Sequence, residues 1–154
     1  MKRFLIIALY PAVRAGLFIQ RVYWQLTQSK VVGAKVLIHW QGRVLLVRNR
    51  YGSGLWTLPG GTVRAKEAPI DGLKREVAEE LGVALRNIWF LGESESMSQR
   101  YGAPYALSLF AARVDSDIVR INDFEISAAQ WFSLDTIPVN VSPIVIQALR
   151  AVSI

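Results

Sequence analysis

Three glutamates near the middle of the chain have the spacing and the chemistry of a cation site. Glu79 and Glu80 follow Glu76 by three and four residues, and residues at those distances share one face of a helix. Carboxylates crowded on one face repel one another, and a hard divalent cation with oxygen ligands relieves that repulsion. The spacing therefore predicts a helix that offers its carboxylates to an ion such as Mg²⁺, with Mn²⁺ as a possible substitute of the same charge.

The residues around these glutamates predict where the helix begins and ends. Leu73, Val77 and Leu81 recur every four residues and give the helix an apolar stripe to bury. Pro69 suits the first helical turn, and Gly82 is typical of the left-handed residue that ends a helix. We therefore expect the helix to lie between this proline and this glycine.

A longer motif, from Gly61 to Val83, contains the helix. It reads glycine, five residues, glutamate, seven residues, then Arg-Glu-apolar-x-Glu-Glu-x-Gly-apolar. This motif resembles the signature of the Nudix hydrolases, and the preceding Trp-Thr-Leu-Pro-Gly also resembles the family's usual approach to it. The fixed positions are filled by Gly61, Glu67, Arg75, Glu76, Val77, Glu79, Glu80, Gly82 and Val83.

The resemblance implies roles for the charged positions of the motif. Glu79 and Glu80 would be the chief metal ligands, with the carbonyl group of Gly60 nearby. Glu76 would be a further ligand, or the base that takes a proton from water. Arg75 would support the site through an ion pair, which its spacing of four residues from Glu79 also favours.

Several other residues are expected to shape the site or to bind substrate. Gly61, Glu67 and Gly82 are structural positions of the motif, and Glu67 is expected to tie the loop to the helix. Glu125, outside the motif, offers a fourth carboxylate or a distant base, although we favour an edge-strand residue. Guanidinium forks match phosphate oxygens, and the candidates near the glycine turn are Arg48, Arg50 and Arg64.

The order of apolar segments predicts an α/β fold. Strands, a helix, further strands and a second helix indicate a mixed sheet between helices, and the resemblance implies an α/β/α sandwich of the Nudix type. Ser142 and Pro143 are expected to begin the second helix, which continues to Val152. The β-rich segments are residues 31–40, 43–50, 55–58, 88–92, 106–114 and 128–132.

Residues 1–30 differ from the remainder, residues 31–154, which we expect to form the hydrolase domain. They hold five of the 18 Lys and Arg residues and none of the 12 acids, so most of the net charge of +6 is theirs. The catalytic part is then nearly neutral, and we expect no nucleic acid partner. The uninterrupted apolar run of the arm is too short to span a membrane, and we expect a cytoplasmic protein.

The same arm is predicted to form an apolar helix with a narrow polar stripe. Such a helix would bury most of its circumference against the domain, against a second subunit in a homodimer, or against a membrane surface. We favour packing on protein, because Arg14 interrupts the apolar run.

These features favour a metal-dependent enzyme over other classes. The chain has no cysteine and one histidine, His39 in an apolar β-rich run, so thiol chemistry and thiolate metal sites are excluded. The resemblance implies a Mg²⁺-dependent pyrophosphohydrolase that acts by direct water attack on a nucleoside diphosphate linked to another moiety. Nucleoside triphosphates, sugar nucleotides and dinucleotides fit that description. The alternative is a catalytically silent Nudix-fold module that binds a nucleotide or regulates a partner.

Overall fold

The computed structural model describes residues 31–97 and 104–152. The expected helix at residues 1–30 lies outside the described residues. Contacts within the chain divide it into two units, one of Met1–Val31 with Glu95–Ala106 and one of Val32–Ser94 with Leu107–Ile154. The second unit holds the motif and most of the sheet, whose strand ends at residue 31, residues 95–97 and residues 104–106 belong to the first unit.

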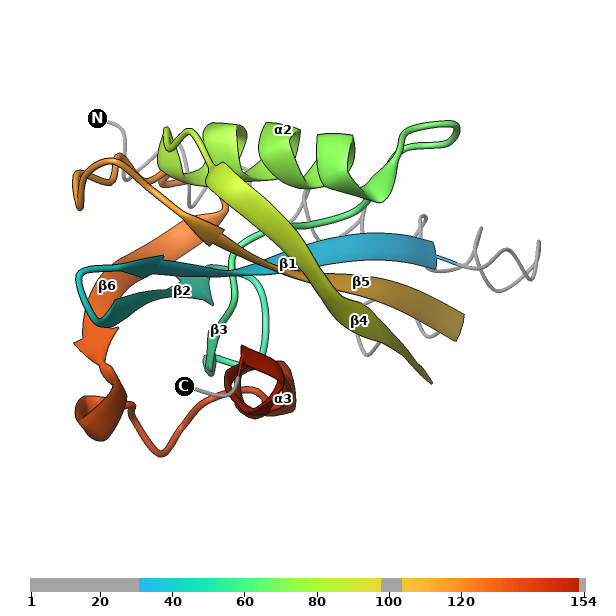
Figure 1. Cartoon of the computed structure of the whole chain (residues 1–154). Coiled ribbons are helices and arrows are strands. Elements are labelled where there is room, and N and C mark those ends of the chain that lie inside the picture. Colours follow the sequence, from blue (N-terminus) through green and yellow to red (C-terminus); the bar gives the residue numbers. More distant parts are fainter. Residues whose placement is uncertain (1–30, 98–103, 153–154) are drawn as a thin grey trace. The chain divides into compact units, whose positions relative to one another are not determined.

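The architecture is a six-stranded sheet with helices on both faces (Figure 1). The strand order is β3-β2-β1-β5-β4, and β6 pairs with β2. The strands are β1 (Val31–Trp40), β2 (Arg43–Asn49), β3 (Trp56–Thr57), β4 (Arg86–Met97), β5 (Pro104–Arg113) and β6 (Ile126–Ser133). The helices are α2 (Pro69–Leu81), the short 3-10 helix η1 (Leu134–Thr136) and α3 (Pro143–Val152).

The hairpin of β1 and β2 forms the centre of the sheet. Its two-residue turn, Gln41 and Gly42, has φ angles of 45° and 75°, as expected of the hairpin turns that match strand twist. The pairing is antiparallel, with Ile38 opposite Leu45. β2 is also antiparallel to β3 and β6, whereas β1 and β5 run in the same direction in Figure 1. The sheet is therefore mixed, as the sequence predicts.

Alternate side chains of the strands enter two separate cores. Leu73 and Val77 of α2 pack with Ala34 and Val36 of β1 on one face of the sheet. On the other face, the buried residues of α3 pack with the opposite set of strand side chains, which includes Leu37 of β1. Because β2 contributes to both cores, its four central apolar residues form a continuous buried run rather than an alternating pattern.

The ends of α2 and α3 follow the sequence closely. Pro69 is the first residue of α2, and Gly82 adopts the left-handed conformation with φ 63°. The N–H of Gly82 donates a 3.0 Å hydrogen bond to the carbonyl oxygen of Ala78, which ends the helix as expected. α3 likewise begins at Pro143 and runs to Val152, as expected, and the hydroxyl of Ser142 just before it donates to Oγ1 of Thr57 at 2.9 Å.

Five of the six strands have limits that differ from those expected, in most cases by one or two residues. β4 continues to Met97 instead of ending near residue 92, and β6 begins two residues earlier than expected, at Ile126. Both extensions depend on pairing with another strand. The local sequence alone therefore does not predict them. The start of β6 affects the candidate site, because the residue before it is Glu125.

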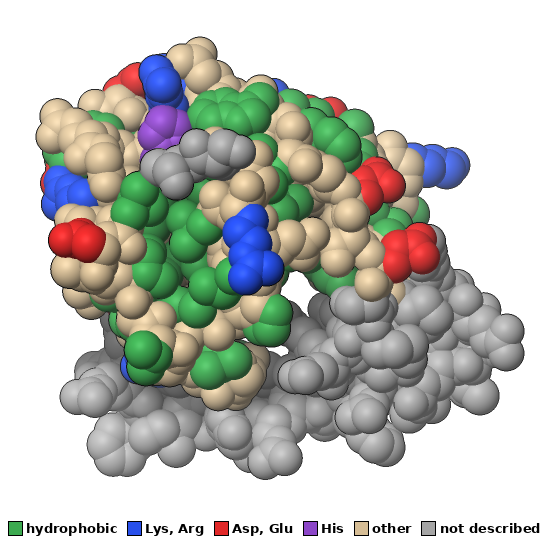
Figure 2. Space-filling model, turned by 60° about the horizontal axis from the view of Figure 1, so that its bottom comes forward, with side chains coloured by type: hydrophobic (Ala, Val, Ile, Leu, Met, Phe, Trp, Pro, Cys, Tyr) green, Lys and Arg blue, Asp and Glu red, His purple; other side chains and the backbone are tan. Residues whose placement is uncertain are grey.

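The α3 side carries apolar side chains among scattered charged ones (Figure 2). Within residues 31–97 and 104–152, neither α2 nor α3 has the length and the hydropathy of a membrane-spanning segment.

Candidate metal centre

The glycine turn before α2 is held against the edge of β1. The N–H groups of Ala34 and Val36 donate hydrogen bonds to the carbonyl oxygens of Gly61 and Pro59, at 3.0 and 3.1 Å. Gly60, between these two residues, has φ 110°, and a Cβ atom there would lie 2.3 Å from the carbonyl oxygen of Ala34. Only glycine tolerates that conformation and that closeness, so the sequence Pro-Gly-Gly allows the turn to pass between β1 and α2.

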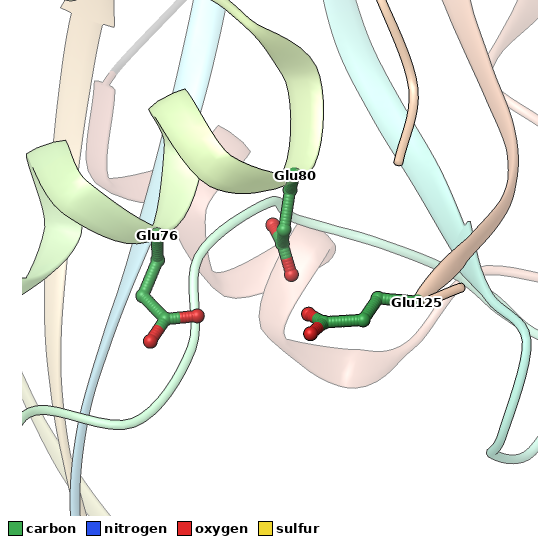
Figure 3. Close-up of side chains that lie close together, drawn as sticks. All are labelled: Glu76, Glu80 and Glu125. Carbon is green, nitrogen blue, oxygen red and sulfur yellow. The ribbon is translucent and has the colours of Figure 1, made fainter. Parts of the chain in front are cut away.

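Three carboxylates meet beside this turn. Glu76 and Glu80 lie one helical turn apart on α2, and Glu125 immediately precedes β6. Each offers an oxygen atom within 4.8 Å of the oxygens of the other two, and Figure 3 shows the three side chains directed toward one another. The first two positions follow from helical spacing, whereas the third depends on the path of the chain 45 residues after Glu80.

The C-terminal end of α2 positions Glu125. The last carbonyl groups of a helix have no partner within it, and here Arg120 and Asn122 donate their backbone N–H groups to the carbonyls of Leu81 and Glu80, both at 2.8 Å. A turn from Asn122 then leads to Glu125, whose N–H donates to the Asn122 carbonyl at 3.1 Å. The structure thus corrects the favoured assignment of Glu125 to an edge strand, since it lies in this turn beside the helix.

Glu80 is the most buried member of the cluster. Its relative accessibility is 6%, and its Oε2 accepts a 3.0 Å hydrogen bond from the N–H of Gly60. Burial raises the pKa of the Glu80 carboxyl, and the neighbouring carboxylates of Glu76 and Glu125 raise it further. The Lys35 ammonium and the Gly60 hydrogen bond act in the opposite direction. A buried carboxylate near two others is costly without a cation.

Arg75 connects the loop of the motif to the helix. Its Nε and one terminal nitrogen donate to the two carboxylate oxygens of Glu67, each at 2.9 Å. The same guanidinium donates to Oε1 of Glu76 at 2.6 Å and to the carbonyl oxygen of Thr62 at 3.1 Å. The hydrogen bonds to Glu67, and after them the one to Glu76, hold the pKa of Arg75 above its usual value. The bond from Arg75 and one from the N–H of Arg64 lower the pKa of Glu67 to about 2.

Glu79 lies apart from the other carboxylates. Its side chain is 54% exposed, and its oxygens lie 3.8 Å from a terminal nitrogen of Arg64 and 3.6 Å from one of Arg75. The structure therefore does not bring Glu79 together with Glu76, Glu80 and Glu125. Its expected role as a chief metal ligand stays a prediction.

The three arginines expected to bind phosphate lie in different surroundings. Arg64 is exposed beside Glu79, and Arg50 donates from Nε to the carbonyl oxygen of Asp123, two residues before Glu125. Arg48 instead places its guanidinium 4.5 Å from the centre of the Trp56 ring, in the core on the α3 side of the sheet. Arg64 thus contacts one of the glutamates and Arg50 contacts a residue close in sequence to Glu125, whereas the Arg48 guanidinium packs on Trp56.

Lys35 of β1 is the charged residue near the centre that the sequence analysis missed. Its ammonium donates hydrogen bonds to the carbonyl oxygens of Leu58 and Gly60, at 2.9 and 2.5 Å. The sequence does contain a signal that could have identified Lys35, because a lysine stands there between Ala34 and Val36 in an otherwise apolar strand. His39, in contrast, lies in β1 as expected and packs edge-to-face on Trp89.

The carboxylate cluster fits a hard divalent cation. Opposite ligands of Mg²⁺ lie about 4 Å apart, because each Mg–O bond is about 2.1 Å. The 4.8 Å limit on the separations among Glu76, Glu80 and Glu125 is within reach of small side-chain rotations. All three donors are carboxylate oxygens, which suit Mg²⁺ and Mn²⁺ better than softer metals. The separations and the donor atoms of these three glutamates therefore fit a divalent ion, and we take the three residues as its candidate ligands among the described residues.

Comparison with known proteins decides the family. Residues 29–151 match the family model of the NUDIX domain. The chain belongs to the Nudix hydrolase family. Its fold agrees with this assignment, because a Nudix hydrolase of the MutT type from Burkholderia pseudomallei superposes with a TM-score of 0.72 at 29% identity, over 80% of this chain and 98% of that one. A Nudix hydrolase from Nitrosomonas europaea gives 0.68 at 26% identity, over 81% and 89%.

Curated Nudix relatives are longer than this chain. The NAD-capped RNA hydrolase NudC of Pseudomonas aeruginosa is 39% identical over 106 residues, which are 67% of this chain and 36% of that protein. The matched region thus spans little more than a third of that relative's length.

Proposed function

We propose that this Nudix protein is a Mg²⁺-dependent pyrophosphohydrolase of a nucleoside diphosphate linked to another moiety, with Mn²⁺ able to replace Mg²⁺. The observation that carries the proposal is the meeting of Glu76, Glu80 and Glu125 beside a glycine turn. A bound divalent ion would neutralise phosphate oxygens and acidify water. The expected reaction is direct attack of water on a bridging phosphorus, since the sequence offers no Ser, Cys or His nucleophile in a recognisable motif.

The residues of the chain supply positioning and charge. Glu76, Glu80 and Glu125 would hold the ion, and Glu76, which contacts Arg75 at 2.6 Å, would bind it or accept the proton of the attacking water. Arg75 fixes that carboxylate and the loop together. Positioning and electrostatics account for most of the acceleration in phosphoryl transfer.

Two further arginines support binding of a phosphate chain. Arg50 and Arg64 lie near the glutamates, and each presents a guanidinium that matches phosphate oxygens. Glu79 would then exchange its contact with Arg64 for a metal ion or for water when substrate binds. The Gly60 carbonyl, which accepts a hydrogen bond from Lys35, remains a candidate ligand that the resemblance implies.

The substrate proposal covers three classes. Nucleoside triphosphates, sugar nucleotides and dinucleotides all contain the required phosphoanhydride. The Pseudomonas aeruginosa relative is named as a hydrolase of NAD-capped RNA, and a dinucleotide joined to RNA is therefore a further substrate to test. Our expectation for this chain is a small nucleotide that is not attached to RNA. We propose that residues 1–30 form a separate arm before a hydrolase domain at residues 31–154. This arm would affect the association state or the location of the protein rather than the chemistry of the metal site.

A product-release screen tests this function. The full chain is incubated with Mg²⁺ or Mn²⁺ and a panel of nucleoside triphosphates, sugar nucleotides, dinucleotides and a 5′-NAD-capped RNA. We expect metal-dependent hydrolysis of at least one class, loss of turnover in Glu80→Gln, and ¹⁸O from labelled water in a phosphate-containing product. Saturable nucleotide binding without turnover of any panel member would instead support a catalytically silent binding module.

A further inference from the structure

Lys35 and Glu80 hold Gly60 from two sides. The Lys35 ammonium donates to the Gly60 carbonyl oxygen at 2.5 Å, and the Gly60 N–H donates to Oε2 of Glu80 at 3.0 Å. The Leu58 carbonyl is a second acceptor for the same ammonium, at 2.9 Å. The glycine turn is therefore bound by a cation on its carbonyl side and by a carboxylate on its N–H side.

The position of Lys35 in β1 explains its approach to the turn. Ala34 and Val36 belong to the core beneath α2, and Leu37 belongs to the core on the α3 side. Because side chains alternate along a strand, Lys35 leaves β1 on the α3 side and Glu80 reaches the turn from α2. The Lys35 charge is still close enough to oppose the rise in the pKa of Glu80 that burial causes.

We propose that Lys35 is a built-in cation of the metal centre, which occupies the Gly60 carbonyl and offsets the charge of Glu80. The inference rests on the proposed function, because it assumes that the glutamates bind a divalent ion. A second cation near the same carbonyl and carboxylate is repelled by the ammonium. Lys35 thus positions the turn in the metal-free protein and weakens binding of the first divalent ion.

Removing the charge of Lys35 should therefore strengthen metal binding. Lys35→Gln keeps an amide donor for the carbonyls but has no charge, and we expect it to bind Mn²⁺ about threefold to tenfold more tightly than the wild type. Lys35→Arg keeps the charge and should bind Mn²⁺ within about twofold of the wild type. A role in loop structure alone would not separate these two variants in this way.

The measurement is Mn²⁺ titration of the full-length protein without substrate, with free Mn²⁺ followed by electron paramagnetic resonance. Lys74→Gln is the matched control, because it removes the same charge from an exposed position of α2. Thermal melting verifies that each variant folds, and Lys35→Met, which keeps an apolar stem, replaces Lys35→Gln if the latter does not.

Each outcome has a distinct meaning. Tighter binding by Lys35→Gln, with wild-type affinity in Lys35→Arg and Lys74→Gln, supports the inference. Unchanged or weaker binding by Lys35→Gln, or an equal gain in Lys74→Gln, overturns it. Glu80→Gln separates the two proposals: if it binds Mn²⁺ like the wild type, the metal centre itself is wrongly assigned. If Glu80→Gln loses binding while Lys35→Gln changes nothing, only the role of Lys35 is refuted.

Discussion

Arg75 and Glu67 form two parallel hydrogen bonds, both 2.9 Å long, across eight residues of sequence. Both side chains are largely buried, with relative accessibilities of 17% and 18%. This paired geometry is specific to a guanidinium, because a lysine ammonium has no fork to match a carboxylate. The loop that precedes α2 is consequently tied to the helix by a contact that only arginine can make in full.

Arg75→Lys should destabilise the protein by about 1–3 kcal/mol, the range for lost hydrogen bonds to charged groups. The matched control is Arg86→Lys, because the contact of Arg86 with Asp115 is also 2.9 Å but its side chains are 60% and 75% exposed. That exposed pair should contribute less than about 1 kcal/mol. Urea denaturation compares the two variants, and equal losses would contradict the importance of the buried fork.

Glu67 should make the stability depend on pH in the acid range. Its pKa is lowered to about 2 by hydrogen bonds from Arg75 and from the N–H of Arg64. A carboxylate with a lowered folded-state pKa stabilises the fold above its unfolded pKa, and the stabilisation is lost as the pH falls toward the folded value. The wild type should therefore exceed Glu67→Gln in stability at pH 7. Denaturation curves should show the difference shrinking from about pH 4.5 to pH 2, and a difference independent of pH would argue against this ion pair.

Glu80→Gln should raise the melting temperature of the metal-free protein by a few degrees at pH 8, since about 1 kcal/mol corresponds to about 2–4 °C in a domain of this size. Burial raises the pKa of Glu80, so the ionised carboxylate is less favourable in the folded state than in the unfolded chain. The wild type should lose stability as the pH rises above the unfolded value, and the variant should not. Gln can still accept the hydrogen bond from Gly60.

The comparison with Glu79→Gln makes that experiment specific. Glu79 is exposed and paired with arginines, so its substitution should leave the metal-free melting temperature unchanged or lower it slightly. Calorimetry measures the melting temperature of each of the two variants in the absence and in the presence of Mg²⁺. A stability gain in Glu79→Gln as large as that in Glu80→Gln would contradict the assignment of the repulsion to the buried cluster.

Glu125→Gln should weaken Mn²⁺ binding and lower turnover by about tenfold or more. Its carboxylate lies within 4.8 Å of Glu76 and Glu80, so the variant removes one anionic ligand. Glu93→Gln removes an exposed carboxylate from β4 and serves as the control. Isothermal titration calorimetry measures the Mn²⁺ affinity of both variants. An affinity of Glu125→Gln equal to that of the wild type would exclude Glu125 from the metal centre.

Alanine substitutions should separate the two glycines of the turn. In Gly60→Ala, the new Cβ meets the Ala34 backbone at 2.3 Å with φ 110°, and we expect a loss of several kcal/mol in stability. In Gly61→Ala, the Cβ meets the Glu76 carboxylate at 2.3 Å, which a rotation of that side chain can relieve. We expect a nearly normal fold with displaced Glu76, weaker Mn²⁺ binding and low turnover.

Gly52→Ala is the control for both glycine variants, because its Cβ meets only Asn49, at 3.8 Å. Chemical denaturation and Mn²⁺ titration of the three variants give the comparison. If Gly61→Ala lost stability as severely as Gly60→Ala while Gly52→Ala did not, the Glu76 side chain would be fixed in place rather than free to rotate.

The sequence predicts the local parts of this centre well. The limits of α2, its apolar stripe and the proximity of Glu76 and Glu80 all follow from periodicity and end signals. Glu125 and Lys35 do not, because their places depend on long-range contacts. The free carbonyls at the end of α2 bring Glu125 in, and the pairing of the glycine turn with β1 brings Lys35 within reach of Gly60.

Glu79 illustrates the opposite limit. Helical spacing predicts that it shares a face with Glu76, yet Arg64 and Arg75 both lie within 3.8 Å of its carboxylate. Which charged partner an exposed side chain contacts depends on loops that have no periodic pattern. Motif spacing therefore identifies the residues available to the centre, and tertiary contacts decide their arrangement.

The hydrogen bond from the Gly60 N–H to Glu80 makes one amide proton a spectroscopic reporter of the centre. Protonation of Glu80, binding of an ion, or replacement of the carboxylate each changes the charge that this proton faces. In a ¹H–¹⁵N correlation spectrum the Gly60 resonance should move with every such event, whereas that of the exposed Gly52 should stay in place. The occupancy of the centre would then be visible in solution before any substrate is known.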